Sequence, residues 1–159
     1  MNNELEVYQV TVTLPGWELL QPLTSGKGIP GRCFVAMSFA NEMDYACDLA
    51  IEPALKDSGL DPRRVDKILD NRNIDEKIIA ELRDAELVVA DFTLQRAGVY
   101  FEAGFARGLG REVFWCCQKD DMSNLHFDTR QFTFIDWTDP DDLKERLTNK
   151  IKALGLARN

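Results

Sequence analysis

Residues 86–109 read ELVVADFTLQRAGVYFEAGFARGL, and this stretch decides the fold. Within it, 87–90 form a continuous apolar run, which is typical of a short strand buried on both faces of a parallel sheet. A loop over 92–97 follows, Gly98 opens a helix, and Gly110 ends that helix as a C-cap. The stretch therefore predicts a buried strand, a short loop and a helix.

Glu102 is the unusual residue of this helix. Counting from it in steps of three and four gives an apolar stripe that should pack on the sheet: Gly98, Val99, Phe105, Ala106 and Leu109. A carboxylate on such a face is costly unless it is paired, although the helix dipole near the N-terminus favours its charged form. The structural explanations would be an acid placed in the first turns only for the helix dipole, or an ion pair with a neighbouring Arg. Because ligands of open α/β sheets bind beyond the carboxyl ends of the strands, Glu102 is also a candidate functional residue.

The rest of the chain alternates between predicted strands and helices. The strands span 33–39, 61–66, 87–90, 112–117 and 131–137, and the helices span 41–58, 74–85, 99–109 and the segment after the N-cap Asp139. Pro53 should kink or break the first of these helices. Repeated β-α units imply an α/β fold, a parallel sheet of about five strands with right-handed crossovers.

The composition is that of a globular protein and argues against several classes of partner. The chain has 159 residues, of which 45% are apolar and 29% are charged. Its formal net charge of −8 argues against a nucleic-acid polymer as partner, which would need a basic surface. No stretch approaches the roughly 18 apolar residues of a membrane span, and the N-terminus lacks a signal core. We expect a cytoplasmic protein that does not bind membranes.

The four cysteines have no pattern of a metal or disulfide framework. They are Cys33, Cys47, Cys116 and Cys117, and none shows Cys-x-x-Cys spacing. We expect buried, reduced thiols, no metal and no cofactor.

Residues 1–31 are predicted to form an N-terminal arm, a short β/α appendage. Residues 5–14 have the β-branched, partly alternating pattern of a strand, and 24–31 have the composition of a linker. A remnant of a preceding module is one interpretation of this arm. The main domain then spans 32–159.

Two segments resemble the active-site segment of a known superfamily. They are Ala90-Asp-Phe-Thr and the run from Gly98 to Gly110, which reads GVYFEAGFARGLG. This pattern is similar to that of the nucleoside 2-deoxyribosyltransferase and nucleotide N-glycosidase superfamily, which includes a TIR-like branch. The resemblance implies a flavodoxin-like, doubly wound sheet, a homodimer or higher oligomer, and Glu102 as the catalytic nucleophile.

The resemblance also implies where a substrate would bind. The end of the first strand contains Ala36, Met37 and Ser38, whose small residues Ala36 and Ser38 would let a ligand approach the backbone, and the loop after it would contact sugar or phosphate. Plain strand packing would explain these residues equally well. The loop before helix 74–85 would contact the base or the ribose, and it contains Asp70, Asn71 and Asn73. Helix capping is the alternative explanation of Asn73.

A polar cluster lies in the long connection after the strand 112–117. It consists of His126, Asp128, Arg130 and Gln131, within a string that reads LHFDTRQ and resembles strings of TIR-like relatives. Donors and acceptors of this kind suit a base edge or a phosphate, and connections of this length are often functional. A loop tied down by an Asp128–Arg130 pair is the structural alternative.

The chemistry implied by the resemblance needs a carboxylate beside a sugar. Cleavage of an N-glycosidic bond passes through an oxocarbenium-like state, which an ionised carboxylate stabilises or traps covalently. Glu102 fits that role. Asp91 and Glu86 are the other acids of this segment, and Asp91 is the expected acid that assists the leaving base, because it lies at the carboxyl end of its strand. Two carboxyls in one pocket push their pKa values apart, which makes one acid available near neutral pH.

Arg96 bears on the class of substrate. By the resemblance, deoxyribosyltransferases carry an acid at this position, and 5′-monophosphate hydrolases carry a small hydroxyl residue. A cation departs from both patterns and suits a phosphate or pyrophosphate, with Gly98 as a further contact. A solvated surface Arg is the alternative.

We therefore expect an enzyme, an N-glycosidase that acts on a nucleoside phosphate or NAD. Two alternatives remain open. One is a nucleoside 2-deoxyribosyltransferase. The other is a non-catalytic nucleotide-binding sensor or effector domain.

Overall fold

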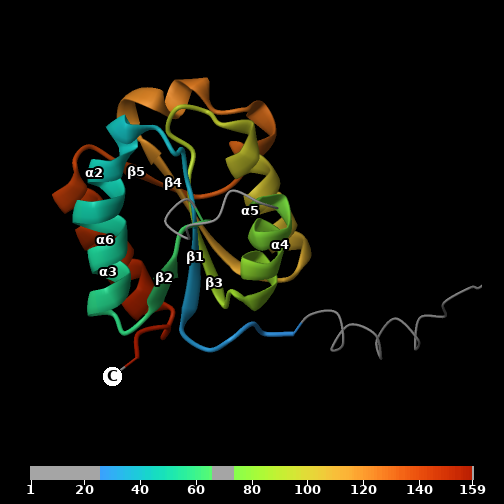
Figure 1. The fold of residues 1–159 in the computed structure, drawn as a ribbon. Coiled ribbons are helices and arrows are strands. Elements are labelled where there is room, and N and C mark those ends of the chain that lie inside the picture. Colours follow the sequence, from blue (N-terminus) through green and yellow to red (C-terminus); the bar gives the residue numbers. More distant parts are fainter. Residues whose placement is uncertain (1–25, 66–73, 159) are drawn as a thin grey trace, which may run out of the picture.

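A sheet of five parallel strands runs through the middle of the computed structural model, which describes residues 26–65 and 74–158 (Figure 1). The strands are β1 (Arg32–Ala36), β2 (Asp61–Arg63), β3 (Leu87–Asp91), β4 (Glu112–Gln118) and β5 (Phe134–Trp137). Their order in the sheet is β2-β1-β3-β4-β5, and every neighbouring pair is parallel. This is the doubly wound, flavodoxin-like arrangement, so the predicted fold class is confirmed.

β3 is the central strand, and all five of its residues are buried. Ala90 lies opposite Ala36 of β1 on one side and opposite Trp115 of β4 on the other. A strand with partners on both edges and helices over both faces has no solvated side. This enclosure explains the continuous apolar run at 87–90.

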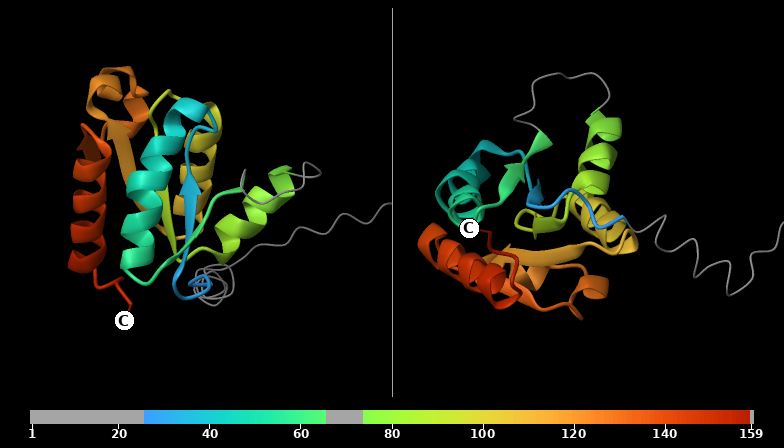
Figure 2. Two further views of the ribbon diagram at one scale, coloured as in Figure 1. Left: turned by 60° about the vertical axis from the view of Figure 1, so that its left-hand side comes forward. Right: turned by 90° about the horizontal axis from the view of Figure 1, so that it is seen from below.

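Helices cover both faces of the sheet (Figures 1 and 2). One face carries α2 (Asp44–Ala46), α3 (Glu52–Asp57) and α6 (Pro140–Ala153), and the other carries α4 (Ile74–Asp84) and α5 (Ala97–Gly108). Because side chains alternate along a strand, Val89 and Cys116 enter the first core, whereas Val88 and Ala90 enter the second. The two faces thus have separate cores.

The two edge strands are short, with three residues in β2 and four in β5. Short edges limit pairing with another chain. Beside β5, the Phe132 ring stacks on Trp115 with a centroid distance of 4.2 Å.

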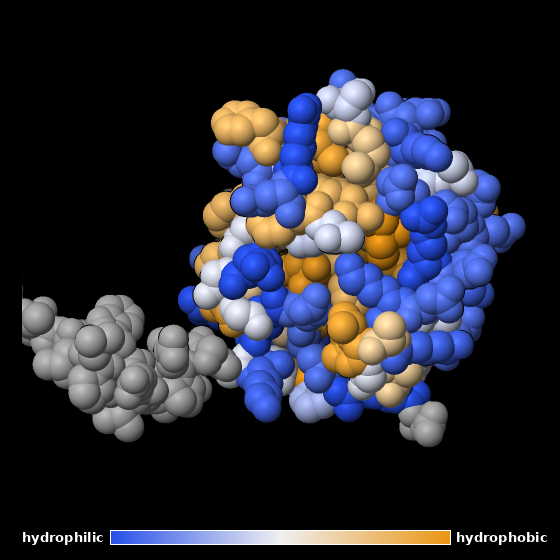
Figure 3. Space-filling view, turned by 180° about the vertical axis from the view of Figure 1, so that it is seen from behind, coloured by the Kyte–Doolittle hydropathy of each residue, from blue (hydrophilic) through white to orange (hydrophobic). Residues whose placement is uncertain are grey.

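Seen from behind, the molecule shows apolar side chains in the middle of its surface with hydrophilic ones around them (Figure 3).

One helical segment from 41 to 57 changes its hydrogen-bond pattern along its length. It begins as the 3₁₀ turn η1 (Asn41–Met43), continues as α2, passes through the π-helical turn η2 (Cys47–Ile51) and ends as α3. Pro53 lies in the first turn of α3. A proline has no N–H, and its ring crowds the carbonyl four residues earlier, so the wider π turn accommodates it. Pro53 therefore alters the predicted helix without ending it.

Some predicted boundaries differ from the structure. β1 ends at Ala36, so residues 37–39 form a loop. β5 begins only at Phe134, because the preceding residues form a turn in which the Thr129 carbonyl accepts the Phe132 N–H. The connection after β4 contains two 3₁₀ helices, η4 (Lys119–Asn124) and η5 (Phe127–Thr129). No helix in the described ranges is long and apolar enough to cross a bilayer.

Parts of the prediction lie outside the described residues. These are the strand 5–14, most of the N-terminal arm, and the loop with Asp70, Asn71 and Asn73.

The four cysteines are all buried, as predicted: Cys33, Cys47, Cys116 and Cys117. Burial raises the pKa of the Cys33, Cys116 and Cys117 thiols. These thiols stay protonated at neutral pH and pack as small hydrophobes.

Helix α5 ends in a Schellman motif at Gly110, as the sequence predicts. Gly110 has a φ of 73°, its N–H donates to the Arg107 carbonyl at 2.9 Å, and the Arg111 N–H donates to the Ala106 carbonyl at 2.9 Å. Glycine adopts this left-handed conformation without a steric penalty. The motif turns the chain into β4.

Replacing Gly110 and Gly104 by alanine should shift the free energy of unfolding in opposite directions. Among the described residues, no neighbouring atom lies within 4 Å of an added Cβ at either position, so backbone conformation decides the outcome. Gly110→Ala should lower the free energy of unfolding by about 1 kcal/mol, because φ stays positive. Gly104→Ala, inside α5, should raise it by about 0.5–1 kcal/mol. Urea unfolding measures both, and a loss in both variants would contradict this assignment.

Candidate functional site

The carboxyl ends of β1 and β3 form the topological switch point of the sheet. After β1 the chain runs to α2 on one face, whereas after β3 it runs to α5 on the other face. The two connections diverge and leave a crevice between them, which is where ligands bind in doubly wound sheets. A cavity of about 360 Å³ lies there, lined by Met37, Ser38, Phe39, Ala40, Arg96, Gly98, Val99 and Glu102. We call it the switch-point cavity.

Glu102 lies between this cavity and another. With Gly98 and Phe101 it also lines a second cavity of about 360 Å³, against Ile78 and Ile79 of α4. The two cavities share Gly98 and Glu102, so Glu102 borders both of them.

The carboxylate of Glu102 is buried without a partner. The residue is 8% exposed, and within residues 26–65 and 74–158 it makes no hydrogen bond and no ion pair, including the Arg pair considered above. Burial raises the pKa of Glu102 to about 7. Near neutral pH this group is therefore divided between its acid and its carboxylate forms.

Arg96 makes one end of the switch-point cavity electropositive. It is the N-cap residue of α5 and has an extended backbone, and its Nε donates to Ser38 Oγ at 3.3 Å. The same oxygen accepts the Ala40 N–H at 3.2 Å. Among the described residues no side chain caps α5, so the positive end of the helix dipole adds to the guanidinium charge. Such an end suits an anion.

Arg64 holds the loop that follows β1. Its buried guanidinium donates from Nη1 to Asp44 Oδ1 at 3.0 Å and from Nη2 to the Ser38 carbonyl at 3.4 Å. It also lies 5.7 Å from the centroid of the Phe39 ring. Phe39 is 48% exposed and lines the switch-point cavity. The sequence did not predict Phe39 as a site residue, because the prediction selected the small residues Ala36 and Ser38, with Met37 between them, near the end of this strand; the strand ends at Ala36, so Phe39 lies in the loop.

Asp91 is not brought beside Glu102. Its Oδ2 accepts the Trp137 Nε1–H at 2.7 Å, and its Oδ1 accepts the Thr93 N–H at 2.9 Å. Burial raises the pKa of Asp91 against these hydrogen bonds. By alternation along β3, its side chain faces the helices α2 and α6, whereas Glu102 is on α5 at the opposite face. Asp91 lines neither cavity next to Glu102.

The cluster around His126 lies in a separate cavity of about 540 Å³. Its lining consists of Gln95, Ala97, Tyr100, Asn124, His126, Asp128 and Thr129. The Tyr100 hydroxyl accepts the His126 N–H at 3.1 Å. Tyr100 and Glu102 are two positions apart on α5 and therefore point to different sides of the helix. His126 and Asp128 thus line a different cavity from Glu102.

The other two residues of that cluster stabilise their own loop. Arg130 donates to the carbonyls of Leu125 and Ser123, each at 3.2 Å, and Gln131 donates to the carbonyl of Asp128 at 3.1 Å. Among the remaining predicted residues, Met37, Ser38 and Gly98 line the switch-point cavity, whereas Ala36 packs inside the second core.

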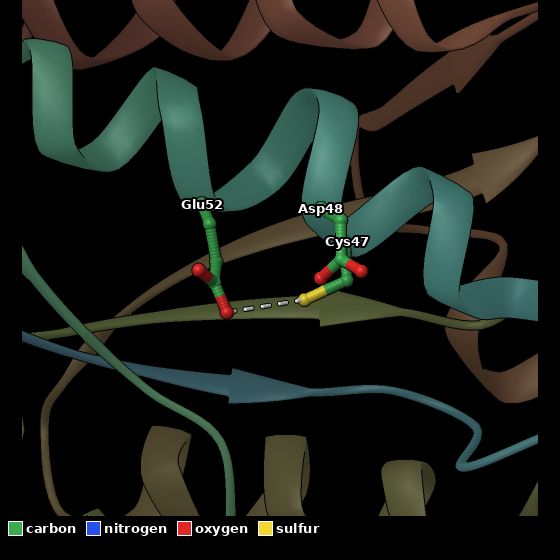
Figure 4. Close-up of side chains that lie close together, drawn as sticks. All are labelled: Cys47, Asp48 and Glu52. Atoms are coloured by element: carbon green, nitrogen blue, oxygen red, sulfur yellow. Dashed lines mark hydrogen bonds between the residues drawn. The ribbon is translucent and has the colours of Figure 1, made fainter. Parts of the chain in front are cut away.

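One group among the described residues could offer three ligands to a cation. It consists of Cys47, Asp48 and Glu52, whose ligand atoms lie within 4.8 Å of one another (Figure 4). The Cys47 thiol is 3.9 Å from Glu52 Oε1, and Glu52 Oε2 pairs with Lys56 Nζ at 2.8 Å. These contacts explain the group as pairing along one helix, and we infer no metal site from it.

Comparison of the chain with models of protein families gave no match. A comparison with curated proteins likewise found no match. A function must therefore be inferred from the geometry of the site and from the resemblance of its motif.

Glu102→Gln should stabilise the protein at alkaline pH. The pKa of this carboxyl group rises from 4.5 to about 7 on folding, so the free energy of unfolding of wild type falls as pH increases through that interval. A neutral amide at this position does not cause that loss. At pH 8 the variant should therefore exceed wild type in unfolding free energy by up to about 3 kcal/mol, and at pH 4 the difference should be small. Denaturant titrations at both pH values measure this. The exposed-site control Glu112→Gln should show no such gain, and equal stability of Glu102→Gln and wild type at pH 8 would refute the pKa assignment.

Proposed function

We propose that the protein is an N-glycosidase that cleaves the bond between base and sugar in a nucleotide, either a nucleoside phosphate or NAD. The observation that carries the proposal is the buried carboxylate of Glu102, which has no partner among the described residues and lies in the crevice at the switch point. Structural carboxylates at this degree of burial are normally paired. A perturbed, unpaired carboxylate in a cleft is typical of a functional site.

Glu102 would act at the anomeric carbon of the sugar. Cleavage of the glycosidic bond builds positive charge on the sugar ring, and an adjacent carboxylate stabilises that charge or forms a bond to the carbon. A pKa near 7 keeps a substantial fraction of Glu102 ionised at neutral pH. In a partly desolvated cavity the attraction between carboxylate and oxocarbenium ion is stronger than in water.

The electropositive end of the switch-point cavity supports a substrate that carries phosphate. Arg96, Ser38 and the start of α5 line the same cavity as Glu102. A guanidinium group and the N–H groups of a helix start are typical phosphate ligands. A nucleotide would then bind with its phosphate at Arg96 and its sugar at Glu102.

The chemistry of the leaving base determines whether the reaction needs a proton donor in addition to Glu102. A purine or pyrimidine base leaves more easily when a group of the enzyme supplies a proton. The nicotinamide of NAD carries its positive charge in the substrate and leaves as a neutral molecule, so a single carboxylate suffices for it. NAD therefore belongs in the first set of substrates beside the nucleoside phosphates.

Base release by wild type and its loss in Glu102→Gln is the central test. Purified protein is incubated with nucleoside mono- and triphosphates, their deoxy forms and NAD, and free base is measured by chromatography. We expect release from at least one of them, and a loss of at least about 10³-fold in Glu102→Gln, because the variant lacks the reacting carboxylate. Glu112→Gln, a surface change of the same chemistry, should retain wild-type activity.

Other outcomes of this assay would favour the alternatives. Formation of a new nucleoside when a free nucleobase is added would identify a deoxyribosyltransferase. Binding without any turnover by wild type would overturn the enzyme proposal and favour a nucleotide sensor, in which Glu102 would only contact a ribose hydroxyl.

Arg96→Gln should discriminate between substrates with and without phosphate. Loss of a charged hydrogen bond costs roughly 1.5–3 kcal/mol, so kcat/KM should fall by about 10- to 100-fold on the nucleotide. It should change little on the corresponding nucleoside. Arg107→Gln, which removes a positive charge from the other end of the same helix, is the matched control. An equal loss on nucleotide and nucleoside would contradict a phosphate contact.

A further inference from the structure

The connection between β3 and α5 contains two consecutive residues in the left-handed region of backbone conformation. Leu94 has a φ of 68° and Gln95 a φ of 51°. A side chain crowds the backbone in this region, so residues other than glycine adopt it rarely. Such strain persists only where the surrounding structure holds it, and it is found preferentially at functional sites.

A carboxylate from another part of the chain holds these two residues. Asp121 lies in η4, after β4, and its Oδ2 accepts the Leu94 N–H at 2.7 Å and the Gln95 Nε2–H at 3.0 Å. Its Oδ1 accepts the Asn124 Nδ2–H at 2.7 Å. Burial acts to raise the pKa of Asp121, but the hydrogen bonds from Asn124, Gln95 and Leu94 outweigh it and lower the pKa. Both carboxylate oxygens are thus used for anchoring.

These contacts lie next to the residue assigned above to phosphate. Gln95 immediately precedes Arg96, whose Nε bonds to Ser38 and whose side chain lines the switch-point cavity. Rotation of the Gln95 backbone out of the left-handed region would redirect the chain at Arg96 and move its guanidinium group. The place of Arg96 in the cavity therefore depends on the conformation of Gln95.

We propose that Asp121 is a positioning residue that holds Leu94 and Gln95 in the left-handed conformation and thereby fixes Arg96 in the switch-point cavity. Asp121 itself does not line that cavity. Its importance for turnover rests on the proposed function, since there Arg96 binds the phosphate. The anchoring of the loop is independent of any substrate.

Hydrogen exchange tests the anchoring in the protein alone. In Asp121→Ala the amides of a peptide covering 93–96 should exchange at least tenfold faster than in wild type, because the Leu94 N–H loses its acceptor. Asp120→Ala removes the neighbouring exposed carboxylate of the same 3₁₀ helix and should leave the exchange unchanged. Equal exchange of this peptide in the two variants would overturn the proposal.

A glycine substitution at position 95 distinguishes a loss caused by backbone strain from a loss caused by general destabilisation of the protein. Because glycine adopts positive φ freely, Gln95→Gly added to Asp121→Ala should recover part of the lost protection and turnover. A loss that grows with the second change would contradict the strain-based role. If Asp121→Ala does not fold, Asp121→Asn keeps the shape and one acceptor oxygen, and the peptide covering 93–96 should still exchange faster in it than in wild type; equal exchange would overturn the proposal.

Kinetics on the best nucleotide test the link to Arg96. Asp121→Ala should raise KM about tenfold with a smaller change in kcat, and combining it with Arg96→Gln should cost no more than Arg96→Gln alone. Independent, multiplicative losses would overturn that link. If wild type releases no base from any nucleotide, the proposed function fails, whereas the exchange measurement still decides whether Asp121 is the anchor.

Discussion

The enclosure of β3 is the constraint on which the rest of the structure depends. This strand is paired on both edges and covered on both faces, so its backbone groups are satisfied only when β1 and β4 lie in register beside it. Ala36 is thereby set opposite Ala90, and the loops after β1 and β3 start at the same level. The crevice that contains Glu102 follows from strand pairing more than from the sequence of either loop.

Structural features that depend on residues only a few positions apart in the chain were predicted correctly from the sequence. The run at 87–90, the glycine end of α5 at Gly110, and the alternation of strands and helices are such features, and the structure contains all of them. Glu102 stood out for the same reason, since its place on an apolar helix stripe can be read from residues three and four positions away.

Features that depend on distant parts of the chain could not be read in this way. Asp91 follows a buried run, but the face to which it points and its bond to Trp137 are set by the sheet as a whole. Phe39 lines the cavity in a loop that Arg64, 25 positions later in the chain, holds in place. His126 and Asp121 come from a connection whose place beside α5 depends on how β4 pairs with β3. Local patterns carry no information on such juxtapositions.

The burial of all four cysteines makes their thiols internal reporters of core opening. A thiol that is protonated and shielded from solvent reacts with an alkylating reagent only when the core around it opens. Cys33, Cys47 and Cys116 belong to one core and Cys117 to the other. The order in which the thiols are modified would therefore distinguish opening of one helical layer from opening of the other.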